Sequence, residues 1–588
     1  MWDVVRAAAP RAAAVVLVAH VLSGVVSALG LLATTDVLAG LLAPGSARHR
    51  LAAALPALTL VVVALVVRGA LDTVAESAQA RLVPTVRLVA EERLVDAALR
   101  ADLAAFDDPS FYHRLHRAGE RGLMRLEEST QHLLALVGAA TAMVAVAGTL
   151  GVLHPALLPV LLLAALPQGW AVLRSARLEY ASQSRTVTLQ RRIDMVGELA
   201  VRRESAAEIR SHQAEPLVRA EYRQAAGRLH GHWVRLGVAQ ARTRAVGRAL
   251  AGVGLAATYA GLGLLVRSGW VPLAVAGAAA IAVQVGASAL ARLIVAANHL
   301  AEQGLYIADY QEFLADAASR ARPSTGRPAP AVPARIDLLG VGFRYPGSEG
   351  TPPALRGIDL TIRAGETIAL VGENGSGKTT LAKLLGGLYR PTSGRITWDG
   401  TDLADLDPTS VADRVTTVLQ EPVRWPLSAR MNVRVGRHDR VDPHDHALLA
   451  AARQARADEV VDSLPHGWHT VLSAYFLGGR DLSGGQWQRV AVARGLYRDA
   501  PVLIWDEPTA PLDARAEHAV YESLRELAGG RTVVLITHRL ASVRHADRIY
   551  LLHEGRIVEQ GTHQELLTAG GRYAELHALQ DRLREVGA

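Results

Sequence analysis

The second half of the chain carries residue types that together suit phosphate chemistry. Residues 372–380 read Gly-Glu-Asn-Gly-Ser-Gly-Lys-Thr-Thr; the glycines let consecutive backbone N–H groups face a phosphate, while Lys378 neutralises its oxygens. The acidic pair Asp506 and Glu507 offers one carboxylate for a metal ion and one to orient or activate water. His538 adds a side chain that can contact the terminal phosphate. This set predicts binding and hydrolysis of a nucleoside triphosphate.

Apolar runs directly before these residues are typical of buried strands. Residues 367–371 precede the glycine loop, residues 502–505 precede Asp506, and residues 532–536 precede His538. Because parallel strands of an open α/β sheet bind ligands at their carboxyl ends, the three groups are expected at one sheet edge. The sequence therefore predicts an α/β domain that binds the nucleotide at this edge.

The glycine loop is expected to contact the nucleotide along its whole length. The contacting residues would be Gly372, Glu373, Asn374, Gly375, Ser376, Gly377, Lys378, Thr379 and Thr380. Thr379 offers its hydroxyl, and Asp506 its carboxylate, to Mg²⁺. Lysine occurs only at Lys378 and Lys383, and arginine takes nearly every other basic position. A lysine rather than an arginine at position 378 is expected for phosphate binding, because a compact ammonium enters a ring of backbone amides more easily than a planar guanidinium.

The first 300 residues hold most of the apolar side chains and predict six membrane crossings. The expected crossings lie within residues 12–35, 51–67, 133–173 (two helices separated at His154-Pro155), 249–266 and 269–291. Arginine crowds the segments between crossings two and three and between four and five, and also the N terminus. This places the N terminus in the cytoplasm, although Arg48 and Arg50 oppose that orientation. The first run is expected to be a retained helix rather than a signal peptide.

Composition excludes several classes of function. The net charge of +7 is explained by arginines flanking the apolar runs, so we expect no nucleic-acid partner. The absence of cysteine excludes disulfides, thiol catalysis and cysteine-ligated metals. His20, Asp36 and Gln284 are polar residues in or near the crossings, where they either line a pathway or lie near an interface.

Two turns interrupt the arginine-rich extensions, near residues 106–117 and 205–217. From spacing alone each is either a capped helix reversal, since Asp108-Pro109 is a good helix start, or a functional contact. Residues 316–333, rich in Pro and Ala, predict a linker between the two halves.

With these motifs in place, residues 336–588 resemble the ATPase domain of ABC transporters, and residues 1–315 resemble the six-helix domain of their exporter class. The resemblance implies an α-helical membrane domain (1–315) and an α/β P-loop ATPase domain (334–588) with an antiparallel β subdomain and a helical subdomain. The two turns would then be coupling helices.

The resemblance also assigns roles to residues that spacing alone does not. Residues 482–486, Leu-Ser-Gly-Gly-Gln, match the signature that caps the nucleotide of the opposite subunit, so Ser483, Gly485 and Gln486 would act in trans. Further expected roles are adenine stacking for Tyr345, a link between Mg²⁺ and the membrane domain for Gln420, and communication across the dimer for Asp513. Glu507, His538 and Lys378 would be catalytic.

Some positions depart from the common exporter pattern. Residues 475–481 replace a glutamate-rich loop before the signature, and Pro511 replaces a small residue. Residues 424–432 and Trp487 resemble a subgroup associated with peptide natural products.

The expected function is ATP-driven export of a modified peptide or amphipathic small molecule across the cytoplasmic membrane. ATP and Mg²⁺ are the expected cofactors, and a second half transporter and membrane lipid are the expected partners. One copy of each motif requires a dimer, either a homodimer or a heterodimer. The alternatives are a lipid flippase and a regulatory subunit, although the intact motifs disfavour the latter. The six crossings disfavour a soluble ABC ATPase.

Overall fold

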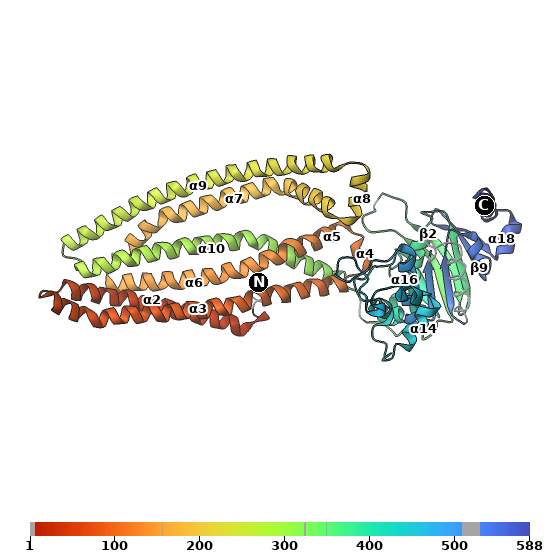
Figure 1. Ribbon diagram of the computed structural model, residues 1–588, viewed down its shortest axis with the longest axis horizontal. Helices are drawn as coiled ribbons and strands as arrows, with labels where there is room; N and C mark the ends of the chain where they lie inside the picture. The colour runs from red at the N-terminus through yellow and green to blue at the C-terminus, as the bar shows by residue number, and fades with distance from the viewer. Residues whose placement is uncertain are drawn as a thin grey trace. The chain divides into compact units, whose positions relative to one another are not determined.

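The chain forms two compact units. The computed structural model describes residues 6, 8–155, 157–322, 325–348, 350–507 and 530–587. One unit comprises residues 1–99 and 113–315, and the other comprises residues 100–112 and 316–588. The first consists of long helices and the second contains the β-sheets (Figure 1). The short segment 100–112 therefore belongs with the sheets, although the sequence around it belongs to the helical unit.

Seven α-helices lie wholly or mostly in the helical unit, among its described residues. They are α2 (Pro10–Leu42), α3 (Ala47–Arg100), α6 (Leu123–Leu153), α7 (Leu157–Val201), α8 (Arg203–Ser211), α9 (Glu215–Arg267) and α10 (Leu273–Ser319). At 1.5 Å per residue, the 54 residues of α3 extend over about 80 Å, far more than the roughly 30 Å of a hydrocarbon core. The helices therefore continue well beyond the membrane, as the arginine-rich segments predict.

Five of the described helices are long and apolar enough to cross a membrane, namely α2, α3, α6, α9 and α10. The chain is therefore a multi-pass membrane protein. The fourth of the six predicted crossings falls in α7, where most side chains between residues 157 and 166 are outside the description, so that crossing stays a prediction. The predicted turn is present, since α6 ends at Leu153 and α7 begins at Leu157.

The second unit contains two sheets, as predicted. The four-stranded antiparallel sheet has the order β2-β1-β4-β5, and the six-stranded sheet has the order β10-β9-β3-β8-β7-β6. The strands are β1 (Arg335–Phe343), β2 (Leu355–Arg363), β3 (Thr367–Gly372), β4 (Ser393–Trp398), β5 (Thr401–Asp402), β6 (Val415–Val418), β7 (Val502–Asp506), β8 (Thr532–Ile536), β9 (Arg548–His553) and β10 (Arg556–Gly561). Strands β9, β3, β8, β7 and β6 pair in parallel, and β10 joins antiparallel.

Both faces of the six-stranded sheet are buried. Ile368 and Leu370 of β3 belong to one hydrophobic cluster, whereas Ala369 and Val371 belong to a second. This alternation follows from the two-residue period of a strand, and it explains why the strands that position the site are continuous apolar runs.

Helices surround the sheets and form a separate helical part. They are α4 (Leu103–Phe106), α5 (Pro109–His116), α11 (Lys378–Leu385), α12 (Pro408–Arg414), α13 (Ala429–Arg434), α14 (His446–Gln454), α15 (Ala457–Asp462), α16 (Gly484–Arg498), α18 (His563–Ala569) and α19 (Arg572–Gly587). A cluster including Leu482 and Trp487 packs α16 against α13 and α15.

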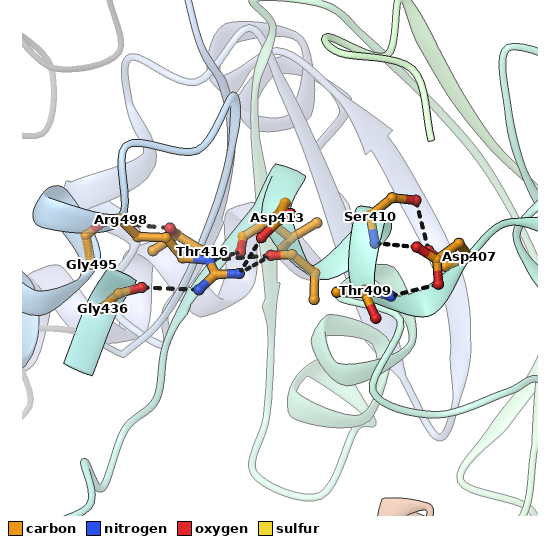
Figure 2. A network of polar contacts seen from close by, with 10 residues as sticks. Asp407, Thr409, Ser410, Asp413, Thr416, Gly436, Gly495 and Arg498 are labelled. Atoms are coloured by element: carbon orange, nitrogen blue, oxygen red, sulfur yellow. Dashed lines mark hydrogen bonds and ion pairs between the residues drawn. The ribbon is translucent and has the colours of Figure 1, made fainter. Parts of the chain in front are cut away.

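Arg498 fixes the far end of α16 to the sheet. Its guanidinium donates to the carbonyl oxygens of Val415 (3.0 Å) and Gly436 (2.9 Å) and to that of Ala412 (Figure 2). Burial lowers the pKa of Arg498. Asp407 accepts hydrogen bonds from the backbone N–H groups of Thr409 and Ser410 and so caps α12 in the same region (Figure 2).

The linker begins later than the sequence predicts. Helix α10 runs to Ser319, into the segment 316–333. Residues 316–319, Asp-Ala-Ala-Ser, contain neither Pro nor Gly, so nothing in them ends the helix. Of the polar residues singled out above, His20 lies 3.5 Å from Gln79 between α2 and α3, whereas Asp36 and Gln284 are exposed.

Candidate functional site

The glycine loop joins β3 to α11, as predicted, and its backbone excludes side chains at two positions. Gly372 has a φ of +150°, and a Cβ there would lie 2.3 Å from the carbonyl oxygen of Leu552. Gly377 has a φ of +103°, and a Cβ there would lie 2.8 Å from the carbonyl oxygen of Ala354. Larger residues do not fit without backbone movement, so the loop keeps a tight turn at the N terminus of α11.

Lys378 is buried beneath this loop. Its Nζ donates to the backbone carbonyl oxygens of Gly372 (2.8 Å) and Glu373 (2.9 Å). Burial lowers the pKa of Lys378, and the nearby carboxylates of Glu507 and Asp506 partly oppose that shift. The ammonium is thus held at the base of the loop, in a position that favours an anion.

The rest of the loop divides into buried and exposed residues. Ser376 is 4% exposed, and its Oγ has no hydrogen-bond partner among the described residues. Thr380 is buried and shares a hydrogen bond of 2.9 Å with the hydroxyl of Tyr345. Glu373, Asn374, Gly375 and Thr379 are exposed. A buried unpaired hydroxyl is costly, so Ser376 fits a site whose phosphate oxygens would accept its hydrogen.

Tyr345 lies close to the loop but is packed inward. Its ring makes edge contacts with Phe343 (5.0 Å between centroids) and Tyr389 (5.7 Å). The residue is half-buried. The structure therefore brings Tyr345 to the loop through Thr380, a contact that sequence spacing did not predict.

Asp506 ends β7 at the predicted edge. Parallel pairing sets it opposite Ile536 of β8, and β8 in turn pairs with β3. The carboxylate is 2% exposed, and its Oδ1 has no partner among the described residues. Burial raises the pKa of Asp506, whereas a hydrogen bond with Thr379 lowers it. A buried carboxylate with one unpaired oxygen beside a threonine hydroxyl has the donor set that Mg²⁺ prefers.

Glu507 and His538 come together, as the sequence predicts. The Oε1 of Glu507 lies 3.1 Å from Nδ1 of His538. The backbone of Glu507 has a φ of +48°, and its N–H donates to the carbonyl oxygen of Ile536 (2.9 Å). A positive φ at a non-glycine residue is uncommon and occurs often at functional sites.

Gln580 supports His538 and was not foreseen. Its Nε2 donates to the carbonyl oxygen of His538 (2.6 Å), and its Oε1 accepts from the N–H of Leu540 (3.0 Å). Gln580 belongs to α19, 42 residues further along the chain, so no local pattern indicated this contact.

The signature residues form the start of α16. Ser483 is the N-cap, and its side chain accepts from the N–H of Gln486 while the Gln486 side chain accepts from the N–H of Ser483. Leu482 is buried, Ser483 is exposed, and Gly485 is partly exposed. The hydrogen bonds of Ser483 and Gln486 thus hold the helix terminus together and leave the exposed side of the signature open.

Gln420 follows β6 at the same edge of the sheet as Asp506 and is exposed. It lines a cavity of about 640 Å³ together with Trp487 and Gln488 of α16. Asp513 and Pro511 lie outside the described residues.

Residues 100–112 pack against the rest of the second unit, to which they belong. The hydroxyl of Tyr389 donates to the carboxylate of Asp107, and Arg320 donates to Asp108 (2.8 Å). A side-chain hydrogen bond with Ser110, helped by Arg320, lowers the pKa of Asp108 to about 2. Burial raises the pKa of Tyr389, and so does its hydrogen bond with Asp107. The tyrosine is therefore neutral at pH 7 and donates its hydroxyl hydrogen to Asp107.

Known proteins resemble this chain in sequence and in fold. Residues 355–510 match the ABC transporter family. The whole chain superposes on the structure of a bacterial Atm1-family ABC exporter with ATP bound, with a TM-score of 0.81, 23% identity and coverage of 98% of this chain and 99% of that chain. Residues 355–510 are therefore an ABC transporter ATP-binding region, and the chain as a whole has the fold of an ABC exporter. An ABC ATPase domain of this kind binds ATP.

Curated relatives match this chain over shorter stretches. It is 44% identical over 259 residues to an ATP-dependent lipid A-core flippase of Chromobacterium violaceum, covering 44% of this chain and 43% of the relative. It is also 44% identical over 269 residues to a mycobactin import ATP-binding/permease protein of Mycolicibacterium thermoresistibile, covering 44% and 45%. The matches thus span less than half the length of these relatives.

Proposed function

We propose that the chain hydrolyses ATP to drive export of a substrate across the cytoplasmic membrane, as one half of a dimer. The observation that carries this proposal is the convergence of Lys378, Asp506, Glu507 and His538 on one sheet edge, beside a loop shaped for phosphate. The apolar helices of the same chain supply the membrane part.

Each site residue has a role in this proposal. Lys378 and the loop residues 372–380 bind the phosphates, and Tyr345 stacks on the adenine. Thr379, Asp506 and Gln420 would hold Mg²⁺, which neutralises charge on the phosphates. Glu507 orients and polarises the attacking water, and His538, held by Glu507 and Gln580, contacts the terminal phosphate.

The signature at residues 482–486 is proposed to act on a second subunit. Ser483, Gly485 and Gln486 would cap the nucleotide bound by the partner subunit, and Asp513 would communicate between the two sites. ATP then favours the closed pair of ATPase domains, and hydrolysis releases it. The segment at residues 106–117 would transmit this change through Asp107 and Asp108, and the segment at residues 205–217 would act likewise. The N terminus and the ATPase domain would face the cytoplasm.

A hydrolysis-deficient variant tests this proposal. Glu507→Gln in the purified full-length protein should lower Mg²⁺-dependent ATP hydrolysis by about 100-fold or more, because the water loses its base, while ATP binding persists. Glu554→Gln is a matched control, since Glu554 is also a glutamate with positive φ (+44°) but is exposed on the turn between β9 and β10. Glu554→Gln should keep wild-type activity.

Two outcomes would contradict parts of the proposal. Unchanged hydrolysis in Glu507→Gln would remove Glu507 from catalysis. An inert wild-type chain would indicate that a different half transporter is needed, which is the heterodimer alternative.

The substrate is proposed to be a modified peptide or an amphipathic small molecule, based on residues 424–432 and Trp487. A lipid flippase is the second candidate, and the name of the Chromobacterium violaceum relative favours it. Stimulation of ATP hydrolysis by a peptide but not by lipid would support the first candidate, and the opposite result would support the second.

A further inference from the structure

A cavity of about 340 Å³ lies in the helical unit, between α7, α9 and α10, and is partly open to its surroundings, with Arg244 and Arg248 exposed. Its volume is at the lower end of the range for small-molecule sites. Its wall carries Ser175 and Glu179 from α7, Arg244 and Arg248 from α9, and Asn298 from α10. Polar side chains from three helices thus converge on one space.

The cavity lies where apolar sequence gives way to charged sequence. The apolar run of α7 ends at residue 173, that of α9 begins at residue 249, and that of α10 ends at residue 291. The polar residues that line the cavity lie just outside these apolar runs, on the arginine-rich side. A substrate with one polar and one apolar part would match this boundary.

The charge of the cavity favours an anion. Arg244 and Arg248 are one helical turn apart and therefore on one face of α9. Neither is in an ion pair within the described part of the chain. Glu179 lines the same cavity, but its Oε2 already accepts a hydrogen bond from Nε2 of Gln240 (3.3 Å). Two guanidinium groups against one carboxylate leave a net positive charge.

Ser175 independently indicates a ligand. Its side chain lines the cavity and the residue is 7% exposed, yet its Oγ has no hydrogen-bond partner among the described residues. A buried hydroxyl of this kind needs a partner, and an oxygen of a bound group would supply one.

The α10 side of the cavity is held firmly against α6. Gln303 is buried, accepts from Ser129 Oγ (2.7 Å) and donates to Glu128 Oε2 (3.0 Å). The ring of His299, which lines the cavity, stacks on His132 with centroids 4.5 Å apart. One wall is therefore fixed before any ligand binds, which lowers the entropic cost of binding.

We propose that this cavity binds an anionic group of the transported substrate, a carboxylate or a phosphate, through Arg244 and Arg248. The inference rests on the proposed transport function. It narrows the substrate to acidic amphipathic molecules, and it leaves a peptide carboxylate and a lipid phosphate as two sources of the same chemistry.

Binding measured without nucleotide tests this inference separately from ATP hydrolysis. The probes are N-acetyl-trileucine with a free carboxylate, its C-terminal amide, dioctanoyl phosphatidic acid and dioctanoylglycerol, titrated by thermophoresis into the detergent-solubilised full-length protein. At least one acid should bind more tightly than its neutral analogue. The acid that binds better then identifies the source.

Paired substitutions assign the binding to the cavity. Arg244→Gln with Arg248→Gln should weaken binding of the acid about tenfold or more, since a hydrogen bond to a charged group is lost, and the double Lys variant should recover part of it. The double variant Arg235→Gln with Arg242→Gln removes two exposed arginines of α9 that do not line the cavity, and it should bind like the wild type.

The inference is overturned if neither acid binds, if the neutral analogues bind equally well, or if the Arg244 and Arg248 double Gln variant retains wild-type affinity. Loss of Mg²⁺-dependent ATP hydrolysis in the wild type, with acid binding intact, would instead contradict the proposed function alone.

Discussion

At the scale of single residues, Lys378 and Asp506 are buried charged groups whose charges a ligand would balance. Both are buried, and burial shifts the pKa of each toward its neutral form. Each charged group therefore opposes folding when nothing balances it. Bound phosphates and a metal ion would supply the missing charges, so nucleotide should stabilise the fold strongly.

Asp506→Asn should separate stability from function. Because the pKa of Asp506 is raised in the fold, its ionised form costs stability at every pH above the unfolded value near 4. The isosteric amide removes that cost at pH 7 but cannot serve Mg²⁺. We expect the melting temperature without nucleotide to stay equal or rise by about 2–4 °C.

In the same variant, the stabilisation by Mg²⁺ and ATP and the hydrolysis should both be lost, as measured by calorimetry and phosphate release. The stability difference from the wild type should shrink as the pH falls toward 4, where Asp506 is protonated. A lower melting temperature at pH 7 would refute this account of the buried charge.

At the scale of elements, the start of α16 combines two tasks in Ser483. Its side chain caps the helix in a reciprocal pair with Gln486, and the signature to which it belongs is proposed to reach the partner's nucleotide. Helix α18 starts with the same arrangement, formed by Thr562 and Glu565, without any proposed role in ATP binding. Thr562 is thus a control for the contribution of Ser483 to helix stability alone.

Ser483→Ala and Thr562→Ala should each lower the free energy of unfolding by about 1 kcal/mol, because each removes an N-cap. Only Ser483→Ala should also lower ATP hydrolysis. Denaturant unfolding and a steady-state ATPase assay measure the two effects. Equal activity in both variants would mean that Ser483 serves the helix alone.

Several elements were predictable from sequence because local pattern determines them. Strands β3, β7 and β8 follow from their apolar runs, and the glycine loop follows from its backbone requirements. Contacts between distant segments did not follow: Tyr389 meets Asp107 across 282 residues, and Gln580 meets His538 across 42. No periodicity encodes such pairs, since they depend on how whole elements pack.

At the scale of the whole molecule, residues 100–112 connect the helical sequence to the sheets. The Tyr389 ring packs beside Tyr345 and Phe343, and its hydroxyl binds Asp107. Only the ring of Tyr389 therefore separates Tyr345, which is proposed to stack on adenine, from the segment 100–112, which is proposed to transmit movement. A small displacement of Tyr345 on ATP binding would therefore shift Tyr389 and, through its hydroxyl, Asp107.

Tyr389→Phe should weaken this transmission and keep the ring packing. The chain lacks cysteine, so Val144→Cys, at an exposed position of α6, can carry one spin label per subunit in the Glu507→Gln background. In the proposed homodimer, ATP should change the distance between the two labels, as measured by electron–electron resonance, and Tyr389→Phe should reduce that change.

Tyr550→Phe is the matched control, because it also removes one buried tyrosine hydroxyl, which donates to the carbonyl oxygen of Thr361 (3.2 Å). Each variant should lose about 1 kcal/mol of stability, yet Tyr550→Phe should keep the full ATP response. A full response in Tyr389→Phe would exclude this tyrosine from the coupling.

Both lysines of the chain lie in the short helix α11, so their chemical modification can report on the nucleotide site. Lys378 Nζ is engaged by two carbonyl oxygens beneath the loop, whereas the Lys383 ammonium lies 5.5 Å from the ring centre of Tyr389 and is only partly buried. An amine-acylating reagent thus meets just two side-chain targets in the whole chain. The ratio of their modification, read by mass spectrometry in intact membranes, would track occupancy of the nucleotide pocket against a built-in reference.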